Sequence, residues 1–235
     1  MQSFKRNPFF TVSAVMFLIL VQSGHAQFTL YYNQSSFLGD GRVADSSALT
    51  FDGIGIGADL TGSRLGGMTL NAPGSGPLLV IDASVGMRGP VTPRSAGTVL
   101  SPGGSNASLQ DDDLEILFSS PVSYFGLDVV FDVPDASFTS VTFLDSGGNV
   151  LGRNSFIPDP AFARDYQFVG GVSDTANIAS VVFDEFDGSP GDDNIAYDNF
   201  LGPMEVVPEP GTLALLGIGL AGVIVAGRNR KRQTR

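Results

Sequence analysis

Short apolar runs separated by turn residues fill the sequence between residues 27 and 204. The runs are rich in β-branched and aromatic residues, and Gly, Pro, Asn, Asp and Ser bound them, which is the pattern of β-strands joined by turns. No convincing helical period interrupts them. The expected strands cover residues 28–32, 78–83, 114–118, 124–131, 138–144, 166–169, 178–183 and 195–201. This pattern predicts an all-β domain over residues 27–203, a single jelly-roll-like β-sandwich.

Two stretches inform on the loops. Residues 145–149, Asp-Ser-Gly-Gly-Asn, join the expected strand that ends at Leu144 to the apolar pair Val150-Leu151 and predict a hairpin loop. The Gly-rich stretch 53–76 fits either weak strands or long loops, and the sequence does not choose between them.

The first 26 residues have the parts of a secretory signal peptide. Lys5 and Arg6 give a positive n-region, residues 9–21 are apolar, and Gly24-His25-Ala26 ends the segment with small residues at the positions that signal peptidase reads. An uncleaved anchor is the weaker alternative, because thirteen apolar residues are too few to span a bilayer as a helix. We expect signal peptidase to cleave between Ala26 and Gln27.

Three segments follow one another at the C-terminal end. Residues 204–210 form a linker that contains Val207-Pro208-Glu209-Pro210. Residues 211–227 are uncharged and mostly apolar, and as a helix they would reach ~25 Å, the lower limit for crossing a membrane. The tail 228–235 should stay in the cytoplasm by the positive-inside rule. Its five positive charges are Arg228, Arg230, Lys231, Arg232 and Arg235.

The proline-containing motif, the apolar run and the basic end together resemble the PEP-CTERM sorting signal of Gram-negative bacteria. The resemblance covers about the last 28 residues. It implies processing near the motif by an exosortase, a membrane-embedded Cys protease, and a place in the cell envelope or in an exopolysaccharide or biofilm matrix. Pro208 and Pro210 favour an extended segment that can enter a protease groove, and Glu209 is a candidate recognition contact. The alternative is an ordinary membrane anchor with a Pro-rich stalk.

Residues 114–202 also resemble the β-sandwich domains found upstream of such tails. The resembling pieces are residues 118–122, 125–129 and 195–200. Those domains are similar to carbohydrate-binding jelly rolls, so the resemblance implies a fold more than a ligand.

The charge and the missing residue types exclude several functions. Residues 27–207 carry six arginines, no lysine and 23 acidic residues, a net charge of −17, which would repel nucleic acid. The chain has no Cys, and its one His, His25, lies in the signal peptide. Ser-His-Asp triads, Cys nucleophiles, Schiff-base lysines and His-ligated zinc are therefore excluded from the domain. We expect no catalytic residue, no enzyme activity and no organic cofactor.

Two acidic clusters, within residues 111–115 and 184–198, are candidates for a structural Ca²⁺ ion because Ca²⁺ prefers several oxygen ligands. Asp113, Asp193 and Asp198 are the preferred ligands, although the spacing does not match an EF-hand loop. A solvated acidic surface is the favoured alternative.

Three function classes remain open. The first is a non-enzymatic surface or matrix protein. The second is a carbohydrate-binding module, which would need an exposed groove of tyrosines. The third is a glycosidase, which would need two facing carboxylates ~5–9.5 Å apart in a cleft. The tyrosines available for stacking on sugars are Tyr31, Tyr32, Tyr124, Tyr166 and Tyr197.

Overall fold

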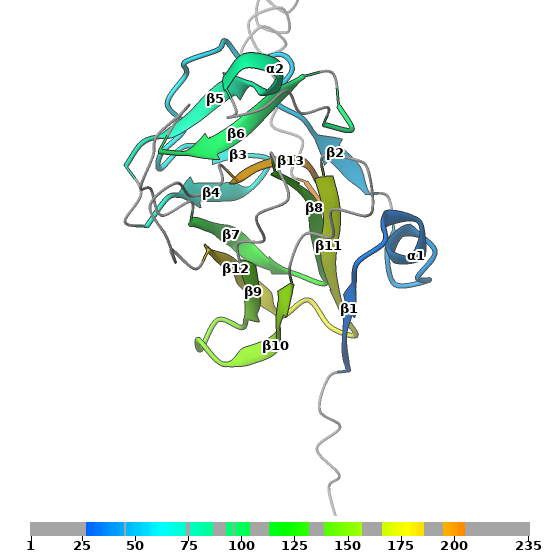
Figure 1. The fold of residues 1–235 in the computed structure, drawn as a ribbon. Helices are drawn as coiled ribbons and strands as arrows, with labels where there is room; N and C mark the ends of the chain where they lie inside the picture. The colour runs from blue at the N-terminus through cyan, green and yellow to red at the C-terminus, as the bar shows by residue number, and fades with distance from the viewer. Residues whose placement is uncertain are drawn as a thin grey trace, which may run out of the picture.

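The computed structural model describes residues 27–44, 46–73, 76–86, 93–95, 97–103, 113–131, 139–156, 166–185 and 195–204. They form two antiparallel sheets that enclose one main hydrophobic core (Figure 1). The first sheet contains, in spatial order, β1 (Phe28–Tyr31), β11 (Tyr166–Ser173), β8 (Tyr124–Phe131), β13 (Ile195–Gly202), β6 (Thr98–Pro102) and β5 (Leu78–Asp82), with β2 (Ser47–Leu49) also on β13. The second contains β10 (Val150–Phe156), β9 (Thr139–Leu144), β12 (Ile178–Glu185), β7 (Leu114–Val122), β4 (Met68–Asn71) and β3 (Arg64–Leu65).

Eight consecutive strands, β6 to β13, give the jelly-roll order. They divide four and four between the sheets, as β6-β13-β8-β11 and β7-β12-β9-β10. Every connection among them crosses to the other sheet except the β9–β10 hairpin. This interleaving is the arrangement of a jelly roll, so the predicted all-β, jelly-roll-like sandwich is confirmed.

Strand β8 shows how the sequence specifies the layers. Phe125, Leu127 and Val129 alternate with period 2 and point into the main core between the sheets. The residues between them are also buried, because two small apolar clusters cover the outer face of the first sheet. One cluster contains Phe37 of α1 (Gln34–Leu38), and the other contains Ala83 of α2 (Ala83–Gly86). Because both faces are covered, β8 reads as one continuous apolar run.

The predicted hairpin loop is present between β9 and β10. The Asp145 carboxylate accepts hydrogen bonds from the backbone N–H groups of Gly147 and Asn149, both at 2.8 Å. Gly148 has φ of 76°, a left-handed conformation that glycine adopts without strain. The Asn149 side chain also donates to the Asp145 carboxylate. This side chain is the largest cause, and the backbone bonds a smaller one, of a pKa of Asp145 below its usual value.

Several elements differ from the sequence prediction. The stretch 53–76 contains both alternatives, a loop over residues 53–63 and the short strands β3 and β4 after it. The sequence pattern does not predict strands β2 and β6, and β7, β10, β11 and β12 are longer than predicted. Helix α1 has five residues, too few for a helical period, and its signal is a side-chain cap: Asn33 Oδ1 accepts from Ser36 N at 3.0 Å.

Candidate functional site

The point where the sorting segment leaves the domain is well defined. Strand β13 ends at Gly202, and Met204 N–H donates to the Gly202 carbonyl at 2.9 Å. Met204 is half-buried against the main core and lies over Gly66, whose positive φ of 55° and missing side chain make room for it. The last described residues are thus fixed to the domain. The motif Val207-Pro208-Glu209-Pro210, the apolar run 211–227 and the basic tail lie outside the described residues.

A shallow hollow of about 300 Å³ lies beside this exit point. Its lining comes from residues 66–68, 118–123, Ala176 and 202–204, and none of these residues is ionisable. A hollow without an acid, a base or a nucleophile other than serine offers shape and apolar contact, not acid–base chemistry.

The predicted signal-peptide junction lies at the start of β1. Ala26 is outside the described residues, whereas Gln27 is described and is paired with Asp174 in the turn after β11. The Gln27 backbone N–H donates to Asp174 Oδ2 at 3.1 Å, and the Asp174 N–H donates to the Gln27 carbonyl at 3.1 Å. Gln27 therefore continues the β1–β11 ladder by one residue.

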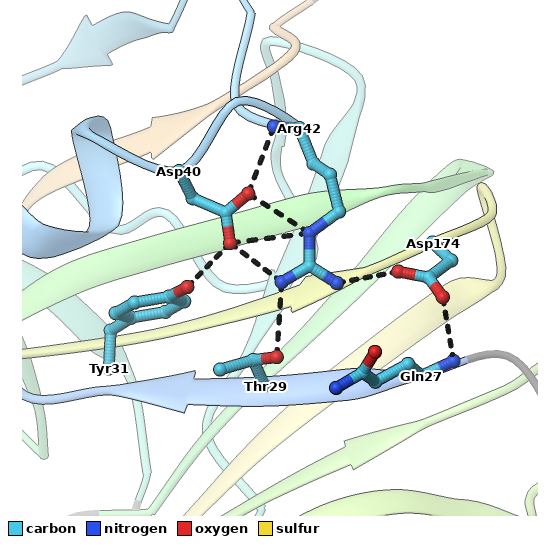
Figure 2. A network of polar contacts seen from close by, with 6 residues as sticks. All are labelled: Gln27, Thr29, Tyr31, Asp40, Arg42 and Asp174. Atoms are coloured by element: carbon cyan, nitrogen blue, oxygen red, sulfur yellow. Dashed lines mark hydrogen bonds and ion pairs between the residues drawn. The ribbon is translucent and has the colours of Figure 1, made fainter.

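Arg42 organises the polar network around this junction (Figure 2). Its guanidinium contacts Asp40 Oδ2 and Asp174 Oδ1, each at 2.6 Å, and donates to Thr29 Oγ1 at 3.0 Å. Hydrogen bonds from Arg42 hold the pKa of Asp40 well below its usual range. The Tyr31 hydroxyl also donates to Asp40, and this bond raises the pKa of Tyr31.

A second polar cluster is buried on the outer face of the first sheet. Asp128 on β8 and Asp198 on β13 are cross-strand partners, and both are fully buried. Arg94 reaches Asp128 with Nε at 2.8 Å and Nη2 at 3.1 Å, a bidentate pair, while its guanidinium lies 4.7 Å from the Tyr166 ring. Asn199 Nδ2 donates to Asp128 Oδ2 at 2.9 Å, and Asn199 has φ of 51°.

Asp198 is the less satisfied of the two carboxylates. The Ser95 hydroxyl donates to its Oδ2, whereas its Oδ1 is buried without a hydrogen-bond partner among the described residues. Burial raises the pKa of Asp198 to about 6, and the charges of Asp52 and Asp128 add to this. Burial also raises the pKa of Asp128, with Arg94 opposing it. The cluster is thus a closed, arginine-neutralised pair rather than an open site with a reactive acid.

The three predicted Ca²⁺ ligands do not meet among the described residues. Asp198 lies on the outer face of the first sheet, Asp113 precedes β7 in the second sheet, and Asp193 is outside the described residues. Within the part of the chain that the structure describes, no group of three or more Asp, Glu, His or Cys residues is placed to hold a metal ion. The Ca²⁺ site stays a prediction.

The five tyrosines do not form a shared platform. Tyr197 lies in the main core and Tyr124 in the cluster under α1, and both are buried. Tyr31 and Tyr166 are half-buried beside Asp40 and Arg94. Tyr32 is 38% exposed and accepts a hydrogen bond from Asn154 Nδ2.

Sequence reasoning singled out Asp198 and Gln27 but missed Arg94, Asp128, Arg42 and Asp174. One signal was available, since Asp128 is the lone acid within the apolar run of β8 and therefore needs a partner. Arg94 and Asp174 lie in loops distant in sequence, 34 and 147 residues from the groups that they bind. Their pairing depends on the complete fold.

Within the described residues no helix has the length and apolar character needed to cross a bilayer. The helix predicted over residues 211–227 falls outside them.

Solved structures with a similar arrangement include two adhesin domains. The K2 cleaved adhesin domain of Lys-gingipain is 14% identical, with a TM-score of 0.45 over 68% of this chain and 99% of that one. The K3 cleaved adhesin domain of Lys-gingipain from Porphyromonas gingivalis w83 is 15% identical, with a TM-score of 0.37 over 66% and 97%. The enzymatically active domain of tailspike protein 4 from bacteriophage CBA120 is 18% identical, with a TM-score of 0.34 over 62% and 21%. No curated protein matches the chain with significance.

The family model of the PEP-CTERM protein-sorting motif matches residues 206–231. The match includes the predicted motif, the apolar run and the first residues of the basic tail, and it begins four residues after the end of β13. The chain therefore carries, directly after its β-domain, the PEP-CTERM sorting motif, a signal of export and of membrane-associated processing by an exosortase.

Proposed function

We propose that the chain is a non-enzymatic protein of the cell surface or of the exopolysaccharide matrix, whose displayed part is the jelly-roll domain. The observation that carries this proposal is the position of the sorting motif. Residues 203–205 alone separate the end of β13 from the matched motif at 206–231. One folded domain is thus followed directly by one sorting signal.

The short spacer has a geometric consequence for processing. From Met204 to Pro210 the chain has six residues, which reach at most ~20 Å when fully extended. The folded domain therefore stays within ~20 Å of the segment that the exosortase would cut. Met204 is held against the core, so this reach is measured from a fixed point.

Residue chemistry supports a non-enzymatic role. Residues 27–207 contain no His, Cys or Lys. Two carboxylates that face each other, Asp128 and Asp198, are fully buried. Arg94 and Asn199 donate hydrogen bonds to the Asp128 carboxylate. A glycosidase needs two carboxylates that line an open cleft.

A carbohydrate-binding module is the alternative, and the tyrosines give it little support. Stacking on sugars requires exposed aromatic faces side by side. Four of the five tyrosines are buried or half-buried, and Tyr32 alone exceeds a third exposed. An affinity for polysaccharide would therefore have to use polar loops or the surface of partly exposed strands.

The decisive experiment is the intact mass of the protein from its host, with and without the exosortase gene. We expect a chain that begins at Gln27 in both strains and ends near Pro210 only when the exosortase is present. Glu209→Gln tests the acid of the motif, and Glu205→Gln, four residues upstream, is the matched control. A chain that keeps residues 211–235 in both strains would show a plain membrane anchor and refute the proposal.

A further inference from the structure

The network around Arg42 contains one cation for two carboxylates. Asp40 and Asp174 both contact the Arg42 guanidinium at 2.6 Å, from opposite sides (Figure 2). The Asp174 side chain is 45% exposed and that of Asp40 10%, so Asp174 is the carboxylate with room for another partner. The three groups together carry a net charge of −1.

The group that faces the free side of Asp174 is the backbone nitrogen of Gln27. Asp174 Oδ1 is taken by Arg42, and Oδ2 accepts from the Gln27 nitrogen at 3.1 Å. We propose that Asp174 is the binding site for the α-ammonium group that appears at Gln27 when the signal peptide is removed. The proposal rests on the export step of the proposed function and is independent of the exosortase step.

Cleavage changes the chemistry of this contact. In the precursor the Gln27 nitrogen is a neutral peptide amide. Hydrolysis of the Ala26–Gln27 bond adds one water, leaves a carboxylate on Ala26 and turns this nitrogen into an ammonium group. The bond from a neutral amide to the Asp174 carboxylate becomes a bond between two charged groups, an ion pair, and the network becomes neutral overall.

The packing of β1 fixes the new terminus at this position. The adjacent residue, Phe28, packs on Phe143 with ring centroids 5.1 Å apart and pairs with Ser173 in the sheet. The charged or titratable groups nearby on β1 and in the loop after α1 are Tyr31, Asp40 and Arg42. Strand β10 also contacts β1, and its Arg153 lies 4.0 Å from Asp184. Asp174 is therefore the described carboxylate placed to receive the ammonium.

The sequence makes this group accessible to a selective measurement. Residues 27–207 contain no lysine, so the α-amine is the sole primary amine of the exported domain. Lys231 in the basic tail supplies an internal reference in unprocessed chains. The experiment uses the exported chain from a host without the exosortase, labels it with an amine-acylating reagent across a pH series, and quantifies the 27–42 tryptic peptide against Lys231 by mass spectrometry.

We expect the α-amine to react about 3- to 10-fold more slowly at pH 7 in the wild type than in Asp174→Asn. The ion pair stabilises the protonated form, and each unit of pKa changes the free-amine fraction tenfold below the midpoint. Asp184→Asn, which removes another exposed, arginine-facing carboxylate, should leave the rate unchanged. Retaining Ala26 through a shifted cleavage site, with Asp174 intact, should restore the faster rate, because the amine is moved ~3.4 Å along the chain.

Three results would overturn the proposal. The first is the same pH profile in the wild type and in Asp174→Asn. The second is a mature chain that starts at a residue other than Gln27. The third is loss of ammonia from Gln27, because attack of the α-amine on the side-chain amide carbon expels NH₃ and leaves a lactam without a positive charge. The intact mass separates the last two from any failure of exosortase processing, which changes only the other end of the chain.

Discussion

At the scale of residues, the buried pair Asp128 and Asp198 is the least expected feature of the domain. Like charges directly opposite each other on neighbouring strands destabilise a sheet. Arg94 offsets one of them, since it is bidentate to Asp128 and two-thirds buried. Among the described residues Asp198 has a hydroxyl partner and no cation, and its Oδ1 has no hydrogen-bond partner, so protonation would remove its charge.

The free energy of unfolding should therefore fall as the pH rises toward the pKa of Asp198. Burial raises the pKa of Asp198 to about 6, compared with about 3.9 in the unfolded chain. Between pH 4 and 6 the folded protein holds a proton that the unfolded chain has released, so the free energy of unfolding falls across this window. Asp198→Asn should remove this part of the fall and gain about 1–3 kcal/mol relative to the wild type between pH 4 and 7, measured by urea unfolding.

Asp145→Asn is the control, because Asp145 should change the free energy of unfolding with pH in the opposite direction. The hydrogen bonds from Asn149 lower the pKa of Asp145, so its stabilising effect is present above pH 4 and is lost as the pH falls. Parallel pH profiles for Asp198→Asn and the wild type would show that Asp198 is not the titrating group.

At the scale of elements, strand β1 is held by its Phe28 ring, which fills the space that two glycines leave free. The Phe28 ring lies over Gly152 of β10 and Gly171 of β11, and a Cβ at Gly171 would come within 2.5 Å of Phe28 Cζ. Phe28 thereby joins an edge strand of the first sheet to the second sheet. This contact closes the sandwich at the end where Gln27 lies.

Gly171→Ala should loosen β1. The added methyl would lie 2.5 Å from Phe28 and 2.8 Å from Phe143, so one ring must move, at a cost of about 1–3 kcal/mol in the free energy of unfolding. Hydrogen exchange should quicken in β1 more than in β8. Gly55→Ala is the matched control, because nothing lies within 4 Å of its added Cβ. Equal stability of the two variants would contradict the claim that Phe28 needs the space at Gly171.

Sequence patterns predicted the elements with strong local signals and missed those held by distant contacts. Strand β8 and the 145–149 loop are placed correctly, because an apolar run and an Asp-Ser-Gly-Gly-Asn turn are local features. Strand β6, Thr-Val-Leu-Ser-Pro, has little pattern of its own and exists because β5 and β13 pair with it. The same applies to Arg94, whose role depends on a carboxylate 34 residues away.

At the scale of the whole molecule, Gln27 and Met204, which lead to the predicted signal peptide and to the sorting motif, lie at one end of the sandwich. Gln27 bonds to Asp174, and Ala176 in the same turn lines the hollow that contains Met204. β11 and β8 lie between β1 and β13, which places the two junctions about 15 Å apart laterally. A precursor with both segments in the membrane would keep this end of the domain against it and the other end outward.

The acidity of residues 27–207, a net charge of −17, predicts a dependence on salt. Self-repulsion destabilises the compact state and salt screens it. Each gain of 1 kcal/mol raises Tm by about 2–4 °C in a domain of this size. We expect Tm to rise between 10 and 300 mM NaCl, with these concentrations chosen to span a roughly fivefold change in Debye length.

Divalent ions at matched ionic strength separate screening from a specific site. Pure screening gives the same Tm in MgCl₂ and CaCl₂. A rise with CaCl₂ alone that continues with the logarithm of its concentration would support the predicted ligands Asp113, Asp193 and Asp198, because this is how a ligand that binds only the folded state stabilises it. No change of Tm with NaCl would refute the self-repulsion argument.

The central position of β13 has a mechanical consequence. The sorting tail continues directly from this strand, which is flanked by β8 on one side and by β6 and β2 on the other. A pull on the tail runs along β13, so the hydrogen bonds to its neighbours are sheared together. The same pull on an edge strand such as β1 could peel its bonds away one at a time. A domain tethered through β13 is therefore attached by a central strand, which should resist traction better than an edge strand such as β1.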